Sequence, residues 1–174
     1  MILKLFISLI SYLLANNVFA EELVAQLSKD EVAITANFDG SEIFSAPPDK
    51  ILLLINNFEL YKEFLPGCLE SSRLSDLDDG FVRGRLVFSL LSKIYSFESN
   101  NKISGHEVSI TQSKGPFTDF RALWTLEVID KNRTRVKFKT TFTLPFILKI
   151  LAPQSMIDKV GNKFINAFAS QLLK

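Results

Sequence analysis

Residues 120–144, FRALWTLEVIDKNRTRVKFKTTFTL, decide the fold class of this chain. Apolar and polar side chains alternate in the first and the last part of this stretch, which is the pattern of strands with one buried face. The side chains expected on the buried face are Phe120, Ala122, Trp124, Leu126 and Val128 in the first strand and Val136, Phe138, Thr140, Phe142 and Leu144 in the second. Polar residues 130–133 separate the strands and predict a hairpin turn. The stretch therefore predicts two antiparallel neighbours in a half-buried sheet.

Four further segments on the N-terminal side of this hairpin have strand patterns. They cover residues 31–38, 81–90, 94–103 and 106–113, and residues 41–45 extend the first one beyond a turn or bulge at Asp39-Gly40. Within 81–90 the alternation assigns to the buried face Val82, Gly84, Leu86, Phe88 and Leu90. Short turns connect consecutive strands, so we expect the sheet to be antiparallel.

Helical patterns occur at two places. Pro48 suits the first position of a short helix that includes the apolar run 51–55, and a second short helix over 60–64 is ended by Pro66-Gly67. From Gln154 to Leu172, apolar residues recur at helical spacing with polar residues between them. Such an amphipathic helix must bury its apolar stripe against the sheet.

The predicted order is a strand, two short helices, about six strands and one long helix. This is the plan of an α+β helix-grip fold, in which a curved antiparallel sheet of about six to seven strands wraps round the C-terminal helix. We expect an apolar cavity between sheet and helix. Residues 21–174 fit a single domain of this kind.

The first 20 residues, MILKLFISLISYLLANNVFA, have the layout of a secretory signal peptide. Lys4 gives a positive start, residues 5–14 form a short apolar run, and small residues surround the end at Ala20. The alternatives are an uncleaved N-terminal anchor and a part of the fold. A signal peptide predicts that residues 21–174 work outside the cytoplasm, in a periplasm or as a secreted protein.

Charge is distributed unevenly along the chain. Residues 21–130 hold 18 acidic and 10 basic residues, whereas residues 131–174 hold 1 acidic and 9 basic residues. Three of the basic residues, Arg135, Lys137 and Lys139, share one face of a predicted strand. They are our candidates for a surface that docks on anionic membrane lipids, and phosphates of RNA would suit the same patch. Alternatively, the two parts of the chain neutralise each other in the fold.

Three segments resemble a known family. Residues 56–68, NNFELYKEFLPGC, contain a Tyr, then Phe-Leu-Pro, then one residue and Cys; Gly115-Pro116-Phe117 precedes Trp124 by seven residues; and residues 164–168 read FINAF. Together they resemble the polyketide cyclase/coenzyme Q-binding family of the START-like superfamily over residues 41–174. That family also includes the bacterial ribosome-association toxin. The resemblance implies a START-like helix-grip fold, although family members are mostly cytosolic or mitochondrial and lack a secretory signal.

Aromatic side chains dominate the candidate binding site, since the chain has 16 phenylalanines. Apolar clefts with few polar groups are typical of lipid sites. The residues expected to line a site for a quinone, an isoprenoid or another lipid are Phe64, Leu86, Phe88, Phe117, Phe120, Trp124, Phe138, Phe142, Phe164 and Phe168. The alternative is a solid core, because protein interiors are usually close-packed.

The sequence offers little for catalysis. His106 is the only histidine and stands near a strand start without an orienting partner, and Cys68 is the only cysteine. One His and one Cys do not make a metal site, and no phosphate- or dinucleotide-binding motif is present. We therefore expect no cofactor, no metal, no catalytic residue and no DNA partner.

Three functions compete. The first is an exported, non-enzymatic carrier of a hydrophobic small molecule or lipid. The second is a cyclase- or dehydratase-like enzyme of the same fold, which needs converging polar groups; Thr140 and Tyr95 are the modest inward candidates. The third is a module like the ribosome-association toxin, which requires that the N-terminus is not an export signal, because ribosomes are cytoplasmic.

Overall fold

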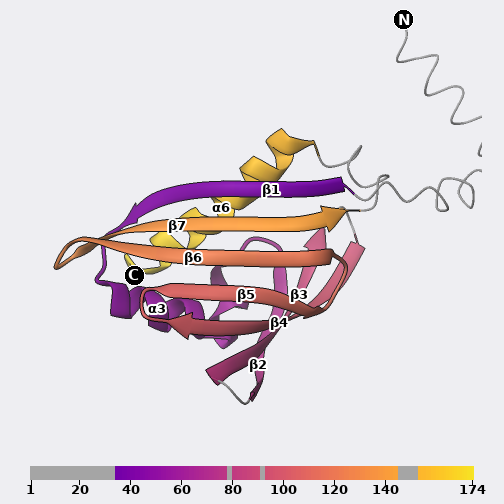
Figure 1. The fold of residues 1–174 in the computed structure, drawn as a ribbon, viewed down its shortest axis with the longest axis horizontal. Coiled ribbons are helices and arrows are strands. Elements are labelled where there is room, and N and C mark those ends of the chain that lie inside the picture. The colour runs from indigo at the N-terminus through magenta and orange to yellow at the C-terminus, as the bar shows by residue number, and fades with distance from the viewer. Residues whose placement is uncertain (1–33, 78–79, 91–92, 145–152) are drawn as a thin grey trace, which may run out of the picture. The chain divides into compact units, whose positions relative to one another are not determined.

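A computed structural model of the chain describes residues 34–77, 80–90, 93–144 and 153–174. These residues form a seven-stranded antiparallel sheet in the order β1-β7-β6-β5-β4-β3-β2, with a long helix behind it (Figure 1). The strands are β1 (Ile34–Phe44), β2 (Cys68–Asp76), β3 (Phe81–Leu90), β4 (Lys93–Ser104), β5 (Glu107–Lys114), β6 (Thr118–Asp130) and β7 (Arg133–Leu144). The helical segments are α3 (Pro48–Asn56), η1 (Phe58–Leu60), α4 (Tyr61–Phe64) and α6 (Gln154–Gln171). The predicted α+β helix-grip fold is confirmed.

The hairpin of β6 and β7 has the predicted turn and the predicted buried face. Trp124 lies opposite Phe138, and both are buried, while Arg135 and Lys139 of the alternate set are exposed. The face that carries Trp124 turns toward the helices and is called the inner face below; the opposite one is the outer face. One exception is Val128, which is exposed because a register shift follows it before Asp130.

Two glycines bring α6 close to the sheet. A Cβ atom on Gly161 would lie 2.4 Å from a ring carbon of Phe38, and one on Gly40 would lie 2.7 Å from the Ile165 side chain. The turn or bulge predicted at Asp39-Gly40 is wrong, since β1 pairs with β7 without interruption through both residues. Gly40 allows α6 to pack closely against the strand. In the sequence, a glycine that permits such a close contact looks the same as one that marks a turn.

The two short helices begin and end where the sequence predicts. Pro48 occupies the first turn of α3, and Gly67 after α4 adopts φ +78°, in the region that glycine tolerates. The buried hydroxyl of Tyr61 donates a hydrogen bond to the carbonyl oxygen of Ile55. Burial raises the pKa of Tyr61, so the phenol stays neutral and ties α4 to the end of α3.

Strand β2 was not located by the sequence patterns. Its residues, CLESSRLSD, are mostly polar and exposed, because β2 is the edge strand of the sheet and only Ser71 is buried. A strand of this kind has no apolar alternation to detect. It accounts for the seventh strand of the predicted six to seven.

The predicted signal peptide, residues 1–20, and the first part of the predicted domain, residues 21–33, lie outside the described residues. Among the helices that the structure describes, none combines the length and the apolar character that crossing a membrane requires.

Candidate functional site

Half of the predicted ligand-lining residues form one packed aromatic cluster between the sheet and α6. Its members are Phe64, Trp124, Phe138, Phe164 and Phe168, joined by Tyr61. The ring centroids of Trp124 lie 4.4 Å from Phe138 and 5.1 Å from Phe168. Trp124 and Phe168 are 1% and 0% exposed. These rings, called the packed cluster below, fill the space between sheet and helix at this level, as the solid-core alternative expects.

A second group of rings gathers at one end of the sheet. It consists of Phe97 on β4, Phe117 just before β6, Phe120 on β6 and Phe142 on β7, and we call it the end cluster. Phe97 and Phe120 have their ring centroids 4.9 Å apart, and Phe117 and Phe142 5.1 Å apart. Phe97 is buried, but the other three rings are half-buried. Within the described residues, the end cluster makes no aromatic contact with α6.

The side chain of Gln112 on β5 fixes the position of Phe117. Its Nε2 donates to the Phe117 carbonyl oxygen at 2.6 Å, and the Phe117 amide donates to its Oε1 at 3.3 Å. The chain passes so close here that a Cβ atom on Gly115 would lie 2.7 Å from the Gln112 Oε1 atom. The Gly115-Pro116-Phe117 segment is therefore held against β5 by a side chain that the sequence analysis did not single out.

Leu86 and Phe88, the remaining predicted residues, lie on β3. The register places Leu86 opposite Phe97 and Phe88 opposite Tyr95, so both share the inner face with the end cluster. Phe88 and Tyr95 stack with centroids 5.8 Å apart, and both are half-buried. Leu86 packs against the core. The structure thus divides the predicted lining into a packed cluster, an end cluster and this smaller pair.

Two polar side chains on the inner face escaped the sequence analysis. Ser99 and Asn101 on β4 are 4% and 6% exposed. The Asn101 Nδ2 atom donates to Ser99 Oγ at 2.9 Å and to the Val82 carbonyl oxygen at 3.1 Å. Thr140 likewise donates to the carbonyl oxygen of Arg121. These groups satisfy each other and the backbone, so they are not aimed at a reacting atom. The sequence feature that could have identified Ser99 and Asn101 is the interruption of the apolar alternation within residues 94–103.

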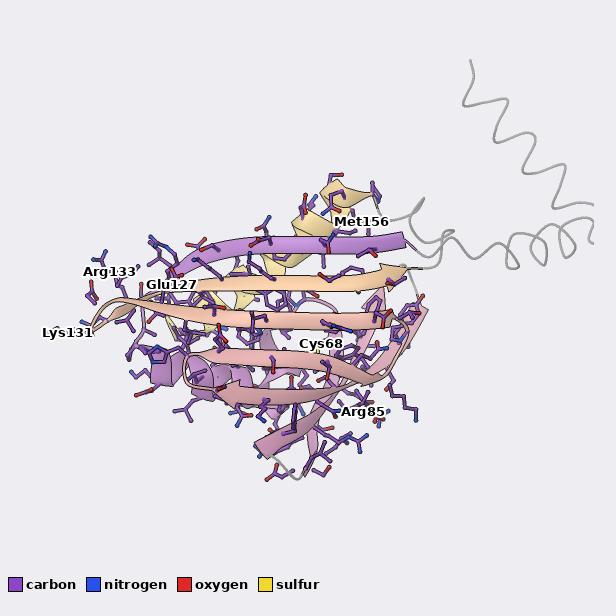
Figure 2. The ribbon with its side chains drawn as sticks, in the orientation of Figure 1. Cys68, Arg85, Glu127, Lys131, Arg133 and Met156 are labelled. Carbon is purple, nitrogen blue, oxygen red and sulfur yellow. The ribbon has the colours of Figure 1, made fainter. Side chains whose placement is uncertain are left out.

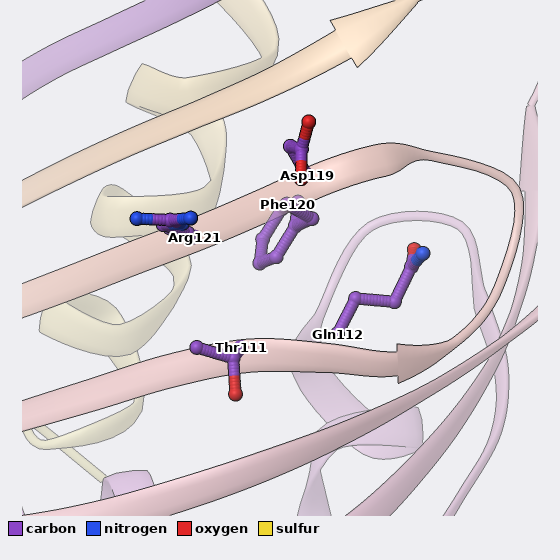
Figure 3. A pocket seen from close by; sticks show the side chains of 5 residues that line it. All are labelled: Thr111, Gln112, Asp119, Phe120 and Arg121. Carbon is purple, nitrogen blue, oxygen red and sulfur yellow. The ribbon is translucent and has the colours of Figure 1, made fainter.

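A pocket of about 350 Å³ adjoins the end cluster (Figure 3). It is lined by Thr111, Gln112, Asp119, Phe120 and Arg121. Pairing between β5 and β6 ends at Thr111 and Arg121, and the β6–β7 register shifts between Thr118 and Arg121. Asp119, within this bulge, has φ +53°. The bulge parts the two strands, and the pocket lies where they separate.

The candidate membrane-docking residues lie on the outer face and are ion-paired. Glu127 contacts both Lys137 and Arg135, and Lys139 Nζ lies 2.8 Å from Asp39 Oδ2. The hydrogen bond from Lys137 is the main cause that lowers the pKa of Glu127. Figure 2 shows Glu127 on β6, with Lys131 and Arg133 at the tip of the hairpin. These pairs support the interpretation that opposite charges neutralise each other, and docking on a membrane stays a prediction.

His106 and Cys68, the two residues considered for their reactive side chains, belong to neither cluster. His106 is exposed in the turn between β4 and β5. Cys68 packs half-buried against the core, and burial raises the pKa of its thiol. The described residues contain no group of three His, Cys, Asp or Glu side chains that would hold a metal ion.

Solved structures with this architecture include aromatase/cyclases. The Zhui aromatase/cyclase from Streptomyces sp. R1128 has a TM-score of 0.70 at 14% identity, covering 80% of this chain and 94% of that one. A START superfamily protein from Mycobacterium smegmatis has a TM-score of 0.63 at 14% identity, covering 79% and 93%. Sheet, short helices and gripped C-terminal helix therefore define a START-like fold.

The chain belongs to the polyketide cyclase/dehydrase and lipid transport family, whose sequence profile matches residues 44–170. Curated relatives include the ribosome association toxin RatA of Pseudomonas aeruginosa, 22% identical over 141 residues that cover 79% of this chain and 96% of the relative. RatA of Vibrio cholerae is 26% identical over 129 residues, covering 74% and 89%. The predicted polyketide cyclase, START-like resemblance is confirmed.

Proposed function

We propose that this protein binds a hydrophobic small molecule, such as a quinone, an isoprenoid or another lipid, at the end cluster. The observation that carries the proposal is the contrast in burial. Phe117, Phe120 and Phe142 are half-buried on the inner face, whereas Trp124, Phe138 and Phe168 at the centre of the packed cluster are buried, and only its border rings, Phe64 and Phe164, are half-buried. Half-exposed aromatic rings grouped on one face present apolar area that a ligand can cover.

Two further features support the end cluster as the binding surface. The Gln112 side chain holds Phe117 by two hydrogen bonds, so the cluster is formed before any ligand arrives. Leu86 and Phe88 continue the apolar inner face on β3. The family to which the chain belongs is described as one of cyclases, dehydrases and lipid transport, which is consistent with an apolar ligand.

The side chains of the described residues favour a protein that binds and carries a ligand over an enzyme. The buried polar side chains are Ser71, Ser99, Asn101 and Thr134, none of which carries a charge or an imidazole. General acid–base catalysis needs a titratable group within reach of the substrate, and Tyr95, the candidate phenol on the inner face, stacks on Phe88. We therefore infer a binding protein, and an enzyme of the cyclase or dehydrase type is the alternative outcome.

Binding is tested with the fluorescent apolar probe N-phenyl-1-naphthylamine and with extraction of lipids from protein purified from its own cells. Phe142→Ala is expected to weaken probe binding at least tenfold, because it removes a half-buried ring that contacts both Phe117 and Phe120. Phe81→Ala is the matched control, since Phe81 is a half-buried phenylalanine on the outer face of the same sheet beneath Lys102. Equal binding by both variants, with no co-purifying lipid, contradicts the proposal.

We also propose that the protein acts outside the cytoplasm. The support is the signal-like sequence of residues 1–20. A reporter enzyme that is active only after export, fused behind residue 20, should be active, and N-terminal sequencing of the mature protein should begin at Glu21. Activity confined to the cytoplasm contradicts export.

Ribosome association is the second candidate, favoured by the RatA relatives, whose lengths this chain nearly spans. It is compatible only with a cytoplasmic location. Sedimentation of the tagged protein with ribosomal particles from its own cells separates the two candidates. Co-sedimentation that survives high salt favours the RatA-like function, and absence from these fractions favours the carrier.

A further inference from the structure

The pocket between β5 and β6 borders the inner surface to which the proposed function refers, and the two share Phe120 and Gln112. Thr111 and Arg121 face each other across the last pair of the β5–β6 ladder, and both side chains are exposed on the outer face. The half-buried ring of Phe120 forms the apolar part of the lining. Figure 3 shows this ring in the space between the two strands, next to Asp119 and Arg121 of its own strand.

Charge at the pocket differs from charge on the neighbouring strand β7. The basic residues of β7 are each paired with an acidic side chain: Arg133 with Asp130, Arg135 and Lys137 with Glu127, and Lys139 with Asp39. Asp119 and Arg121 have opposite charges and lie two residues apart. They form no ion pair with each other, and neither forms one with another residue in the described part of the chain.

The bulge explains why these two charges stay apart. Side chains two residues apart on a regular strand point to the same side and can approach each other. Asp119 is instead in the left-handed region at φ +53°, within the register shift that precedes Arg121. Figure 3 shows the Asp119 carboxylate and the Arg121 guanidinium extending in different directions from Phe120. One carboxylate and one guanidinium thus flank an aromatic ring.

We propose that this pocket binds a small aromatic zwitterion, the chemistry of a free aromatic amino acid. The ligand's ring would stack on Phe120, its ammonium would face Asp119, and its carboxylate would accept hydrogen bonds from Arg121. A volume of about 350 Å³ accommodates a molecule of this size. The proposal goes beyond the inner-face carrier function; because both sites use Phe120, its test relies on the charged residues Asp119 and Arg121, which only the pocket contains.

Three probes with the same ring and different charges test the proposal. They are L-phenylalanine, 3-phenylpropionate, which lacks the ammonium, and phenethylamine, which lacks the carboxylate. Each is titrated to millimolar concentration into the purified protein while backbone amide NMR signals are followed. We expect L-phenylalanine to bind most tightly and to shift the signals of Thr111, Gln112 and Arg121. Equal binding of the three probes, or no saturable shift of these signals, overturns the proposal.

Two variants test which charged group of the ligand is bound by Asp119 and which by Arg121. Asp119→Asn should weaken L-phenylalanine and phenethylamine by about fivefold and leave 3-phenylpropionate unchanged, because exposed charge pairs contribute modestly. Arg121→Gln should weaken L-phenylalanine and 3-phenylpropionate instead. Asn tolerates the left-handed backbone at 119, so folding is preserved. If Phe142→Ala weakens N-phenyl-1-naphthylamine binding but Asp119→Asn and Arg121→Gln show none of these charge-dependent effects, the pocket proposal is overturned and the end cluster stands. If the charge-dependent effects occur but the unchanged protein does not bind N-phenyl-1-naphthylamine, the end-cluster proposal is overturned and the pocket stands.

Discussion

The packed cluster and the end cluster are built from the same residue type on the same sheet, yet they have different surroundings. Around Trp124, two layers meet: β6 and β7 supply rings from one side, and α6 supplies Phe164 and Phe168 from the other. The end cluster uses rings from the sheet and from the segment before β6. Its rings contact each other, and all but Phe97 remain half-buried. Aromatic residues are buried where the helix covers them and stay partly exposed where it does not, and the latter are the ones we propose for binding.

This difference rests on where α6 is seated. Gly40 and Gly161 let the helix approach β1, and Gln154 at its start donates a hydrogen bond to the carbonyl oxygen of Asn37. The helix therefore follows one edge of the sheet and reaches Tyr61 and Phe64 of the short helices near its end. Helix position, more than aromatic content, separates core from surface in this fold.

The largest expected effect distinguishes the two clusters by stability. Phe168→Ala removes a fully buried ring and should lower the free energy of unfolding by about 3–5 kcal/mol. Phe142→Ala removes a half-buried ring and should lower it by about half as much, because less apolar area returns to water. Urea unfolding followed by circular dichroism measures both. Equal losses would mean that the end cluster is part of the core.

A smaller effect is expected from filling the space between helix and strand. Gly161→Ala would normally favour a helix, but here the added Cβ meets the ring of Phe38 at 2.4 Å. We expect a net loss of about 1–3 kcal/mol from overpacking. Asn162→Ala, at the exposed neighbouring position, is the control and should be neutral or stabilising. If Gly161→Ala also stabilises the protein, α6 does not lie this close to β1.

Removing the Gln112 contact tests whether the end cluster is held in place. Gln112→Ala deletes two hydrogen bonds to the backbone of Phe117 and should cost about 1–2 kcal/mol in the free energy of unfolding. It should also weaken N-phenyl-1-naphthylamine binding, since Phe117 is then free to move. Ser113→Ala, at the exposed next position, controls for the substitution. A loss of stability with unchanged probe binding would show that the contact serves the fold only.

Much of the fold was readable from the sequence because its elements carry strong periodic signals. The hairpin of residues 120–144 and the amphipathic helix from Gln154 have a single apolar face each, and both formed as predicted. Strand β2 lacks such an apolar face and therefore gave no pattern. At Gly40, a glycine needed for a close contact has the same sequence pattern as a glycine in a turn. Local pattern cannot separate these two uses of glycine, because the partner, Ile165, is distant in sequence.

The candidate site was only partly predictable. The sequence identified nine of the ring-bearing residues but not their division, because the division depends on which rings α6 covers. Phe97 was not selected, although its position on β4 alternates correctly with Tyr95. The pocket at Asp119 depends on a bulge and a left-handed residue, for which non-glycine sequences give little warning.

The smallest expected effect concerns pH. The difference between the clusters in the loss of unfolding free energy, Phe168→Ala against Phe142→Ala, should not depend on pH. The only titratable side chain in either is Tyr61, and its raised pKa keeps it neutral across the acidic and neutral range. Acid should act on the outer face instead, where ion pairing lowers the pKa of Glu127. That contribution to stability is fully present above the ordinary pKa of about 4.3 and is lost as pH falls through the lower value of the folded protein. Glu127→Gln should therefore flatten the decline in unfolding free energy between about pH 5 and pH 3. The gap between Phe168→Ala and Phe142→Ala should stay constant over the same range, and a gap that closes in acid would show that the ion pairs help to hold α6 against the sheet.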